Sequence, residues 1–535
     1  MRFMRSFNTF QCSLSSFRRS SMNFPTRVYV LQLQHSMRNH LSHLNQLFES
    51  ASTVISKTNY QQIRPSITNH TNENYNRTDV MIENNSGNRI TAHPNKKFLS
   101  IDSKELQIVD LRLPYLWLRD SCKSAHSVDP QTSQKLFKTS DIPINIHPLR
   151  AKIYRNKTSS KLELSIDWSH NLNPRPDSFK SEQSVFELLY LKDAISSSQW
   201  NNSKNKAHSL SRILWSTNGS TLNSKNNPIK SLNSQNDLFI DYSLLKDNPE
   251  VVLEALKRMN KLGLVFFKNV GTEELELGEL IRSLGLDIRR TFYGDLWNVQ
   301  SEGKEAKNVA STSHSLDFHM DLVHFQNPPR FQFLHCLKNR VKGGESGFVD
   351  SYSVILEILR NSPELFKTLS EEEVQFEYVN NNHHTFYSHR TIELQPNVSP
   401  DSIIVKPDSL FKSLISVNYS PPFQAPFDPK VFYEQGGKTF NNLRFENLLR
   451  GLREFERICR SEEMGFEIKL EEVQCVAFDN RRILHARKSF EDSSNSDQVS
   501  SDKIMKRSEK PEIRRWLKGC YVDGDSVWDR LRVLS

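Results

Sequence analysis

A histidine and an aspartate near the middle of this sequence have the spacing of a metal-binding pair. His319 and Asp321 are separated by one residue, so on an extended backbone their side chains point to the same face. Fe(II) oxygenases bind iron through two histidines and one carboxylate on one face, and the opposite positions stay open. A lone His-x-Asp pair also occurs by chance in exposed loops. We expect the rest of the chain to bring His485 and Arg515 to this pair.

Length and composition limit the class of protein. The chain has 535 residues, enough for two or three domains. Its 36% apolar content is low for a globular protein, and the deficit lies mainly in stretches rich in Asn and Ser. Apolar runs are too short for a membrane span. The six cysteines include no Cys-x-x-Cys pair, which predicts a reducing compartment rather than a disulfide framework.

The net charge of +9 is concentrated at the N-terminus. Residues 1–48 contain six arginines and no acidic residue, which leaves +3 for the remainder. This distribution argues against a nucleic-acid partner. An Arg- and Ser-rich segment without acidic residues is typical of a mitochondrial transit peptide, and a disordered basic tail is the alternative. Residues 49–98, rich in Asn, Thr and Ser, predict a disordered linker.

Two domains are expected after the linker. A small β-rich domain is predicted over residues 99–216, because residues 106–120 are dense in strand formers and residues 162–168 alternate apolar with polar. Polar insertions are predicted at 196–206 and 217–236.

The second domain is expected to span residues 237–535 and to mix short strands with a few helices. Helices are predicted at residues 248–262, 275–284, 363–369 and 440–460. Strands are predicted at residues 264–267, 331–336, 348–350, 403–405, 415–419, 473–478 and 516–521. Residues 491–511 are expected to form a surface insertion. The pattern favours a mostly β fold, a jelly roll with helical buttresses.

The run 478–487, which contains His485, decides the family resemblance. Together with the His-x-Asp pair, it resembles the Fe(II)- and 2-oxoglutarate-dependent, TauD-like oxygenases of the γ-butyrobetaine and trimethyllysine dioxygenase family, as a fungal-type member. The resemblance extends from about residue 106 to 534 and includes residues 117–120, 291–294, 334–338 and 343–344. It implies a double-stranded β-helix, with iron held by His319, Asp321 and His485.

The resemblance also implies cosubstrate residues. Arg515 is expected to bind the 5-carboxylate of 2-oxoglutarate, with Arg514 as the alternative, because a guanidinium binds a carboxylate bidentately. Leu334 is expected to line the cosubstrate pocket through its backbone, and ascorbate is an expected cofactor.

A structural zinc ion is doubtful in this sequence. Family members commonly hold zinc in the N-terminal domain with three cysteines and one histidine. Here Ser124 and Ser127 replace two of the cysteines. Cys122, His126 and His170 offer only three ligands for a tetrahedral site. The alternative is a domain held by its core alone.

The implied substrate is a small trimethylammonium compound, enclosed by aromatic rings through cation–π attraction. Tyr293, Trp297 and Tyr521 match the enclosing positions, and Asn308 matches a residue that contacts the far end of the substrate. Ser311 replaces a further enclosing tyrosine. The alternative is that Tyr293, Trp297 and Tyr521 are core residues without a role in substrate binding.

The resemblance favours hydroxylation of γ-butyrobetaine in carnitine biosynthesis. Trimethyllysine is the alternative substrate, and a non-catalytic binding protein on the same fold is the alternative class. A homodimer is compatible with this interpretation.

Overall fold

The structure, a computed structural model, describes residues 80–84, 87–172, 183–195, 212–215, 229, 238–300, 312–380, 382–433, 441–491 and 513–535. The predicted transit peptide lies outside these residues, as do most of the expected linker and Asn308 and Ser311. The same holds for the insertion predicted at 196–206 and for nearly all of those at 217–236 and 491–511. These expectations therefore stay predictions.

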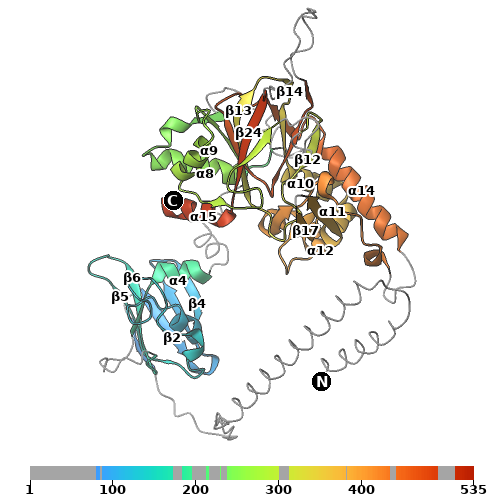
Figure 1. Ribbon diagram of the computed structural model, residues 1–535. Helices are drawn as coiled ribbons and strands as arrows, with labels where there is room; N and C mark the ends of the chain where they lie inside the picture. Colours follow the sequence, from blue (N-terminus) through green and yellow to red (C-terminus); the bar gives the residue numbers. More distant parts are fainter. Residues whose placement is uncertain are drawn as a thin grey trace, which may run out of the picture. The chain divides into compact units, whose positions relative to one another are not determined.

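The N-terminal part contains two small sheets and its own apolar core (Figure 1). One sheet has the order β1 (Met81–Glu83), β5 (Pro148–Arg155), β6 (Leu162–Trp168) and β7 (Gln183–Glu187). The other has the order β2 (Asn88–His93), β3 (Phe98–Ser103) and β4 (Ile108–Pro114). The alternation predicted at 162–168 is confirmed, because β6 buries Leu162, Leu164, Ile166 and Trp168.

Two expectations for this region were wrong. Strands β1 and β2 lie inside the range predicted as a linker, where β2 pairs along its whole length with β3. The predicted strand at 106–120 ends at Pro114, and α3 (Tyr115–Asp120) follows as a helix. Pro114 has the φ angle of −60° that its ring imposes, and it stands at the N-cap of α3. The helix buries Tyr115 and Leu118 in the core, so tertiary packing outweighs local strand propensity.

The C-terminal part is built on two facing sheets. The larger has the order β10 (Ile288–Arg289), β24 (Arg515–Val522), β13 (Phe331–Asn339), β21 (Cys475–Asp479), β9 (Leu264–Lys268) and β8 (Phe239–Asp241), and β11 (Trp297–Gln300) also pairs with β24. The smaller has the order β12 (Leu316–His319), β22 (Ile483–Arg487), β15 (Ser346–Asp350) and β20 (Gly465–Ile468). Phe348 of β15 packs edge-on against Phe266 of β9 and Phe478 of β21, with ring centroids 6.1 and 5.5 Å apart. The apolar space between the sheets is therefore filled by side chains from both.

Helices cover the outer face of the larger sheet. The helices α8 (Pro249–Lys261), α9 (Glu276–Ser283) and α15 (Gly524–Leu534) share one core cluster with that face. Helix α8 begins where the Asn248 side chain accepts a hydrogen bond from the Val251 amide. It ends before Gly263, whose φ of +84° suits glycine, and a Cβ there would approach Ile483 to 2.7 Å.

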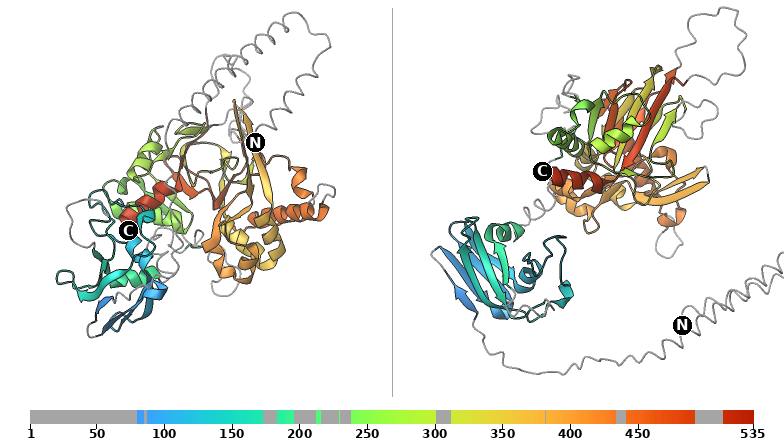
Figure 2. Two further views of the ribbon diagram at one scale, coloured as in Figure 1. Left: turned by 90° about the horizontal axis from the view of Figure 1, so that it is seen from below. Right: turned by 60° about the vertical axis from the view of Figure 1, so that its left-hand side comes forward.

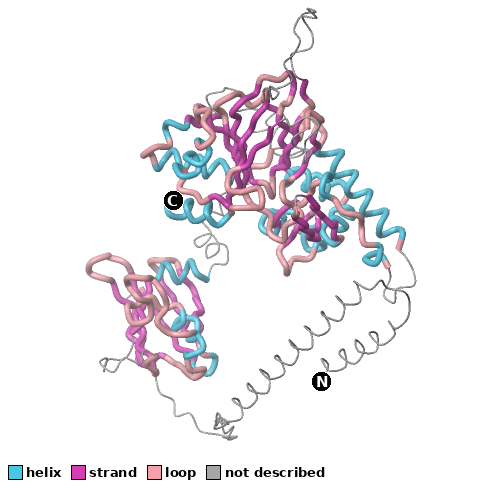
Figure 3. Tube along the Cα trace, in the orientation of Figure 1, coloured by secondary structure: helices cyan, strands magenta, loops and turns pink. Residues whose placement is uncertain are grey.

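A second group of helices packs beside the smaller sheet (Figures 2 and 3). It comprises α10 (Ser351–Asn361), α11 (Pro363–Glu371), α12 (Pro400–Val405), α13 (Leu410–Ser413) and α14 (Asn442–Cys459). The strand predicted at 403–405 was wrong, because Pro400 starts a helical turn there. The hairpin β16 (Glu373–Asn380) and β17 (His383–Arg390) and the pair β18 (Ile392–Leu394) and β19 (Leu414–Val417) complete this part.

The predicted helical buttresses are present, but the fold contains more helix than the predicted mostly β class implies. The remaining strands and helices predicted between residues 237 and 535 match observed elements within a few residues at their ends.

The helices among the described residues are too short or too polar to span a membrane.

Candidate active site

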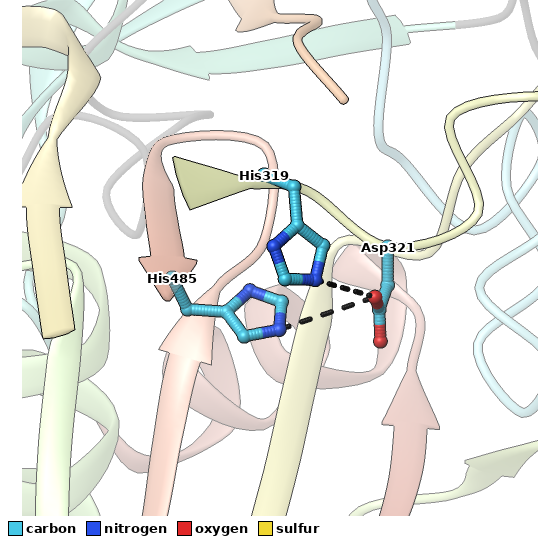
Figure 4. Close-up of side chains that lie close together, drawn as sticks. All are labelled: His319, Asp321 and His485. Atoms are coloured by element: carbon cyan, nitrogen blue, oxygen red, sulfur yellow. Dashed lines mark ion pairs between the residues drawn. The ribbon is translucent and has the colours of Figure 1, made fainter. Parts of the chain in front are cut away.

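His319, Asp321 and His485 converge at one edge of the smaller sheet (Figure 4). His319 ends β12 and stands opposite His485 of β22 in the antiparallel ladder, which brings their ring centroids to 4.1 Å. Asp321 Oδ1 lies 3.5 Å from His319 Nε2 and 3.9 Å from His485 Nε2. Within the described part of the chain, this is the one group of three or more potential ligands whose donor atoms lie within 4.8 Å of one another.

The two histidines have their Nε2 atoms directed at the shared site. His319 Nδ1 lies 2.7 Å from the Asp317 carbonyl oxygen, so Nδ1 carries the proton and Nε2 keeps its lone pair. Burial and the neighbouring His319 together lower the pKa of His485 to about 3, so this imidazole is neutral. A neutral imidazole nitrogen is the form that binds a metal.

The Asp321 carboxylate is held by groups beyond the three ligands. Its Oδ2 accepts hydrogen bonds from Gln332 Nε2 at 2.8 Å and from the Tyr521 hydroxyl at 2.9 Å, which leaves Oδ1 facing the imidazoles. The Asn480 side chain accepts from the Asp321 amide and donates to its carbonyl oxygen. Burial alone raises the pKa of Asp321, but the neighbouring His319 and His485 and the hydrogen bond from Tyr521 outweigh it, and the net pKa is below the usual value.

This donor set fits a divalent iron ion. Two neutral nitrogens and one anionic oxygen on a single face match the preference of Fe(II) in oxygenases, and Gln332 and Tyr521 fix the carboxylate as such sites require.

Arg515 is a buried cation that forms no ion pair with the residues that the structure describes. Its side chain is 5% exposed, and its Nε has no hydrogen-bond partner among the described residues. Burial and the nearby Arg487 together lower the pKa of Arg515 to about 10. Both guanidiniums lie over the Phe490 ring, at 5.4 and 5.3 Å from its centroid. Since Arg487 lies two residues after His485 on β22, Arg515 points toward the end of the strand that carries the metal ligand.

The alternative anchor, Arg514, is partly exposed, and its backbone oxygen accepts from the Arg340 amide. Leu334 lies opposite Gly519 of β24 and packs against the core between the two sheets. An uncompensated buried cation is unfavourable, so the arrangement at Arg515 fits a ligand carboxylate.

The three aromatic residues predicted to enclose the substrate lie close together. Tyr293 and Trp297 have centroids 6.4 Å apart, and Trp297 and Tyr521 5.1 Å apart. The Trp297 indole covers Gly519 so closely that a Cβ there would lie 2.3 Å from the ring. Tyr521 also donates to Asp321, a second role that sequence reasoning missed.

Sequence reasoning also missed Tyr378. This residue of β16 meets Tyr293 edge-on, with ring centroids 6.3 Å apart. No local pattern distinguishes it from the other aromatic residues of its hairpin, because only tertiary structure brings β16 to Tyr293.

The candidate zinc ligands do not form a metal-binding group. Cys122, His126 and His170 are not among the described residues that cluster as potential ligands. The Cys122 thiol donates instead to Ser124 Oγ at 3.3 Å, and His170 Nδ1 lies 2.8 Å from Ser169 Oγ. Burial raises the pKa of Cys122, but hydrogen bonds with His126 and several serines lower it to about 6.

Comparisons with known proteins place this site in a family. A dioxygenase of Strobilurus tenacellus, named dioxygenase str8, is 34% identical over 435 residues, which are 80% of this chain and 86% of that protein. Human γ-butyrobetaine dioxygenase is 28% identical, with 55% of this chain and 66% of that protein covered. Bovine mitochondrial trimethyllysine dioxygenase is 24% identical, with 81% and 86% covered.

The family described as taurine catabolism dioxygenase TauD, TfdA family matches residues 228–521, a segment that holds both facing sheets and all three converging ligands. More than half of the chain is matched, and the Strobilurus relative extends the similarity beyond it. This protein therefore belongs to the TauD/TfdA family of dioxygenases.

Proposed function

We propose that this protein uses Fe(II) and 2-oxoglutarate to hydroxylate γ-butyrobetaine. The observation that carries the iron and 2-oxoglutarate part is the convergence of His319, Asp321 and His485 in the same fold as a buried Arg515, whose Nε has no hydrogen-bond partner among the described residues. These four residues account for the metal and for the far carboxylate of the cosubstrate. When bound, the iron and 2-oxoglutarate supply the activation of dioxygen and release succinate and carbon dioxide.

The residues of the chain position the reactants. His319, His485 and the Oδ1 atom of Asp321 would hold the metal, while Tyr521 and Gln332 keep the carboxylate from rotating. Arg515 would bind the 5-carboxylate of 2-oxoglutarate and so fix the orientation of the cosubstrate.

Aromatic rings would hold the substrate cation. Tyr293 and Trp297 would attract a trimethylammonium group through their ring faces. Tyr521 touches both Trp297 and the Asp321 carboxylate, so a cation held there lies beside the metal site.

Trimethyllysine is a second candidate substrate. The bovine trimethyllysine dioxygenase matches 81% of this chain, compared with 55% for human γ-butyrobetaine dioxygenase, although its identity is lower. A binding protein without catalysis is disfavoured because three ligands and the arginine are all in place.

Succinate formation tests the proposal. Purified protein with Fe(II), 2-oxoglutarate, ascorbate and dioxygen is incubated with γ-butyrobetaine, with trimethyllysine, or with neither, and His319→Ala serves as the inactive control. We expect γ-butyrobetaine to increase succinate and to yield a product one oxygen atom heavier. A rate that is independent of both substrates would contradict the substrate class, and a fully active His319→Ala protein would contradict the iron site.

We also propose a mitochondrial location, supported by the acid-free segment 1–48 and by the mitochondrial bovine relative. Residues 1–48 fused to a fluorescent protein should enter mitochondria, whereas the fusion with Arg18→Glu and Arg19→Glu should not. Cytosolic fluorescence from the unaltered fusion would contradict the proposal.

A further inference from the structure

We propose that His324 is a specificity-determining residue of the substrate pocket. Its Nε2 would accept a hydrogen bond from a substrate ammonium group that retains an N–H. This inference rests on the proposed function and adds to it, because it predicts that a dimethylammonium head group binds at least as well as a trimethylammonium one.

His324 is the last member of a row of neighbouring aromatic side chains, and the first member of that row is hydrogen-bonded to Asp321. This aromatic series consists, in order, of Tyr521, Trp297, Tyr293, Tyr378 and His324. Consecutive ring centroids lie 5.1, 6.4, 6.3 and 5.2 Å apart. The first ring is hydrogen-bonded to Asp321, and the last follows Asp321 by three residues, close enough for the carboxylate to raise the pKa of His324. A cation held by the series is therefore close to the metal site.

His324 has one nitrogen in use and one without a partner. Its side chain is 1% exposed, and its ring stacks on Tyr378 at an interplanar angle of 19°. Nδ1 lies 2.6 Å from Thr385 Oγ1 of β17. Nε2 is buried and has no hydrogen-bond partner in the described part of the chain. A buried polar atom left in this state is unfavourable, so a ligand that satisfied it would recover that free energy.

The imidazole is neutral, which decides the kind of ligand it can satisfy. Burial lowers the pKa of His324 to about 4, although Asp321 opposes this. A neutral imidazole beside a cation can direct its Nε2 lone pair at the cation and bond Thr385 through Nδ1–H. The aromatic faces attract any methylated ammonium ion. Only a head group that keeps an N–H can also donate to Nε2, because a quaternary nitrogen has no hydrogen to donate.

Other buried histidines of this chain differ in their surroundings. His389 uses Nε2 to bond the Phe325 carbonyl oxygen, and His335 uses Nε2 to bond that of Gly271. His335 also has a partnerless nitrogen, Nδ1, and burial lowers its pKa to about 4. It lies on β13, however, where its side chain and that of Leu334 point to opposite faces of the sheet. His335 is therefore a matched control for the burial of a neutral histidine away from the aromatic series.

Two substitutions separate the nitrogens of His324. The amide of His324→Asn reaches the place of Nδ1 and can keep the Thr385 contact, but it leaves Nε2 empty. The longer His324→Gln reaches the place of Nε2 and can keep the acceptor. Binding of 4-(dimethylamino)butanoate and 4-(trimethylammonio)butanoate is measured by calorimetry on anaerobic full-length protein loaded with Fe(II) and 2-oxoglutarate.

We expect the wild-type protein to bind the dimethyl compound at least as tightly as the trimethyl compound. His324→Asn should raise the dissociation constant of the dimethyl compound by about tenfold or more, the usual effect of losing a hydrogen bond to a charged group. The dissociation constant of the trimethyl compound should change by no more than about twofold. His324→Gln should retain most of the dimethyl affinity. His335→Gln should leave the ratio of the two dissociation constants unchanged.

Several results would overturn the inference. One is a wild-type protein that binds the trimethyl compound tenfold more tightly than the dimethyl compound. Another is a ratio of the two dissociation constants that is the same in His324→Asn as in the wild type. The third is no binding of either compound. Succinate formation is measured in parallel and reports on the proposed function separately. If the ratio of the two dissociation constants depends on His324 but neither compound is hydroxylated, only the proposed function is refuted. If the trimethyl compound is hydroxylated but the ratio does not depend on His324, only the role of His324 is refuted.

Discussion

Replacing Arg515 by methionine should make the protein without cosubstrate more stable. Burial and the neighbouring Arg487 lower the pKa of the Arg515 guanidinium from its usual value to about 10. At about 1.4 kcal/mol per pKa unit, this corresponds to roughly 3 kcal/mol of destabilisation. Because the folded state has the lower pKa, the destabilisation is fully present below pH 10 and fades only as the pH rises above it. Methionine has no charge to desolvate, so we expect the unfolding free energy to rise by up to that amount at neutral pH.

The same substitution should remove the response to 2-oxoglutarate. In the wild-type protein the cosubstrate carboxylate would pair with the guanidinium and raise the melting temperature. Losing a buried charge-assisted contact costs about 2–5 kcal/mol, which is about thirtyfold or more in the apparent KM for 2-oxoglutarate. Thermal unfolding with and without 2-oxoglutarate, together with KM measurements, gives both readouts on one protein.

Arg514→Met is the matched control. Arg514 is the preceding residue, it is partly exposed, and its side chain points to the other face of the strand. We expect its substitution to leave the melting temperature without cosubstrate nearly unchanged, as is usual for surface positions. The KM for 2-oxoglutarate should change by no more than about twofold. A larger KM increase for Arg514→Met than for Arg515→Met, or a destabilised Arg515→Met protein that still binds 2-oxoglutarate normally, would refute the reasoning.

Further predictions concern the metal and the aromatic residues. His319→Ala and Asp321→Ala should abolish turnover and reduce iron content with an unchanged circular dichroism spectrum; wild-type turnover would contradict the ligand assignment. Tyr521→Phe should lower iron affinity by roughly 10–100-fold, because the hydroxyl orients Asp321, and an iron titration measures this. Trp297→Ala should lower kcat/KM for a trimethylammonium substrate, since a desolvated aromatic face contributes up to about 2 kcal/mol. Ser311→Tyr, which adds an aromatic face, should raise kcat/KM for the same substrate; an unaltered kcat/KM in both variants would make these aromatics core residues.

The clustering of the three candidate metal ligands could be predicted because the His-x-Asp signal is local and because these residues lie on strands or directly after one. A His-x-Asp pair at the end of a strand needs no tertiary information to place two side chains together. Bringing His485 to them depends on the ladder between β12 and β22, and the ladder places His485 opposite His319. The family resemblance supplied this long-range pairing, which periodicity alone does not contain.

The parts that sequence reasoning missed depend on tertiary contacts. Residues 115–120 have strand-forming side chains, yet they form a helix because Pro114 ends the preceding strand and the core accepts Tyr115. Tyr378 and His324 carry no motif at all, and they meet only because the β16–β17 hairpin packs against the segment after Asp321. Local pattern therefore predicted the ligands but not their surroundings.

The register of β24 connects the candidate functions of the site. Arg515, Gly519 and Tyr521 are separated by even numbers of residues on this strand, so they share one face. Leu517 lies between them and packs in the core between the two sheets, whereas Cys520 and Val522 pack against the helices on the opposite face. One face of β24 thus presents the proposed cosubstrate anchor, the glycine that the Trp297 indole covers and the hydroxyl that is hydrogen-bonded to Asp321.

A shift of β24 by one residue would reverse all of these side chains at once. Arg514 and Cys520 would then face the metal site, and Arg515 and Tyr521 would meet the apolar helices. Pairing with β13 on one side and with β10 and β11 on the other holds the register against such a shift. The register also places Arg515, and not the adjacent Arg514, on the face of β24 that carries Tyr521. A single strand therefore sets the position of the candidate cosubstrate anchor, of the hydroxyl that orients the Asp321 carboxylate and of the backbone against which the Trp297 indole packs.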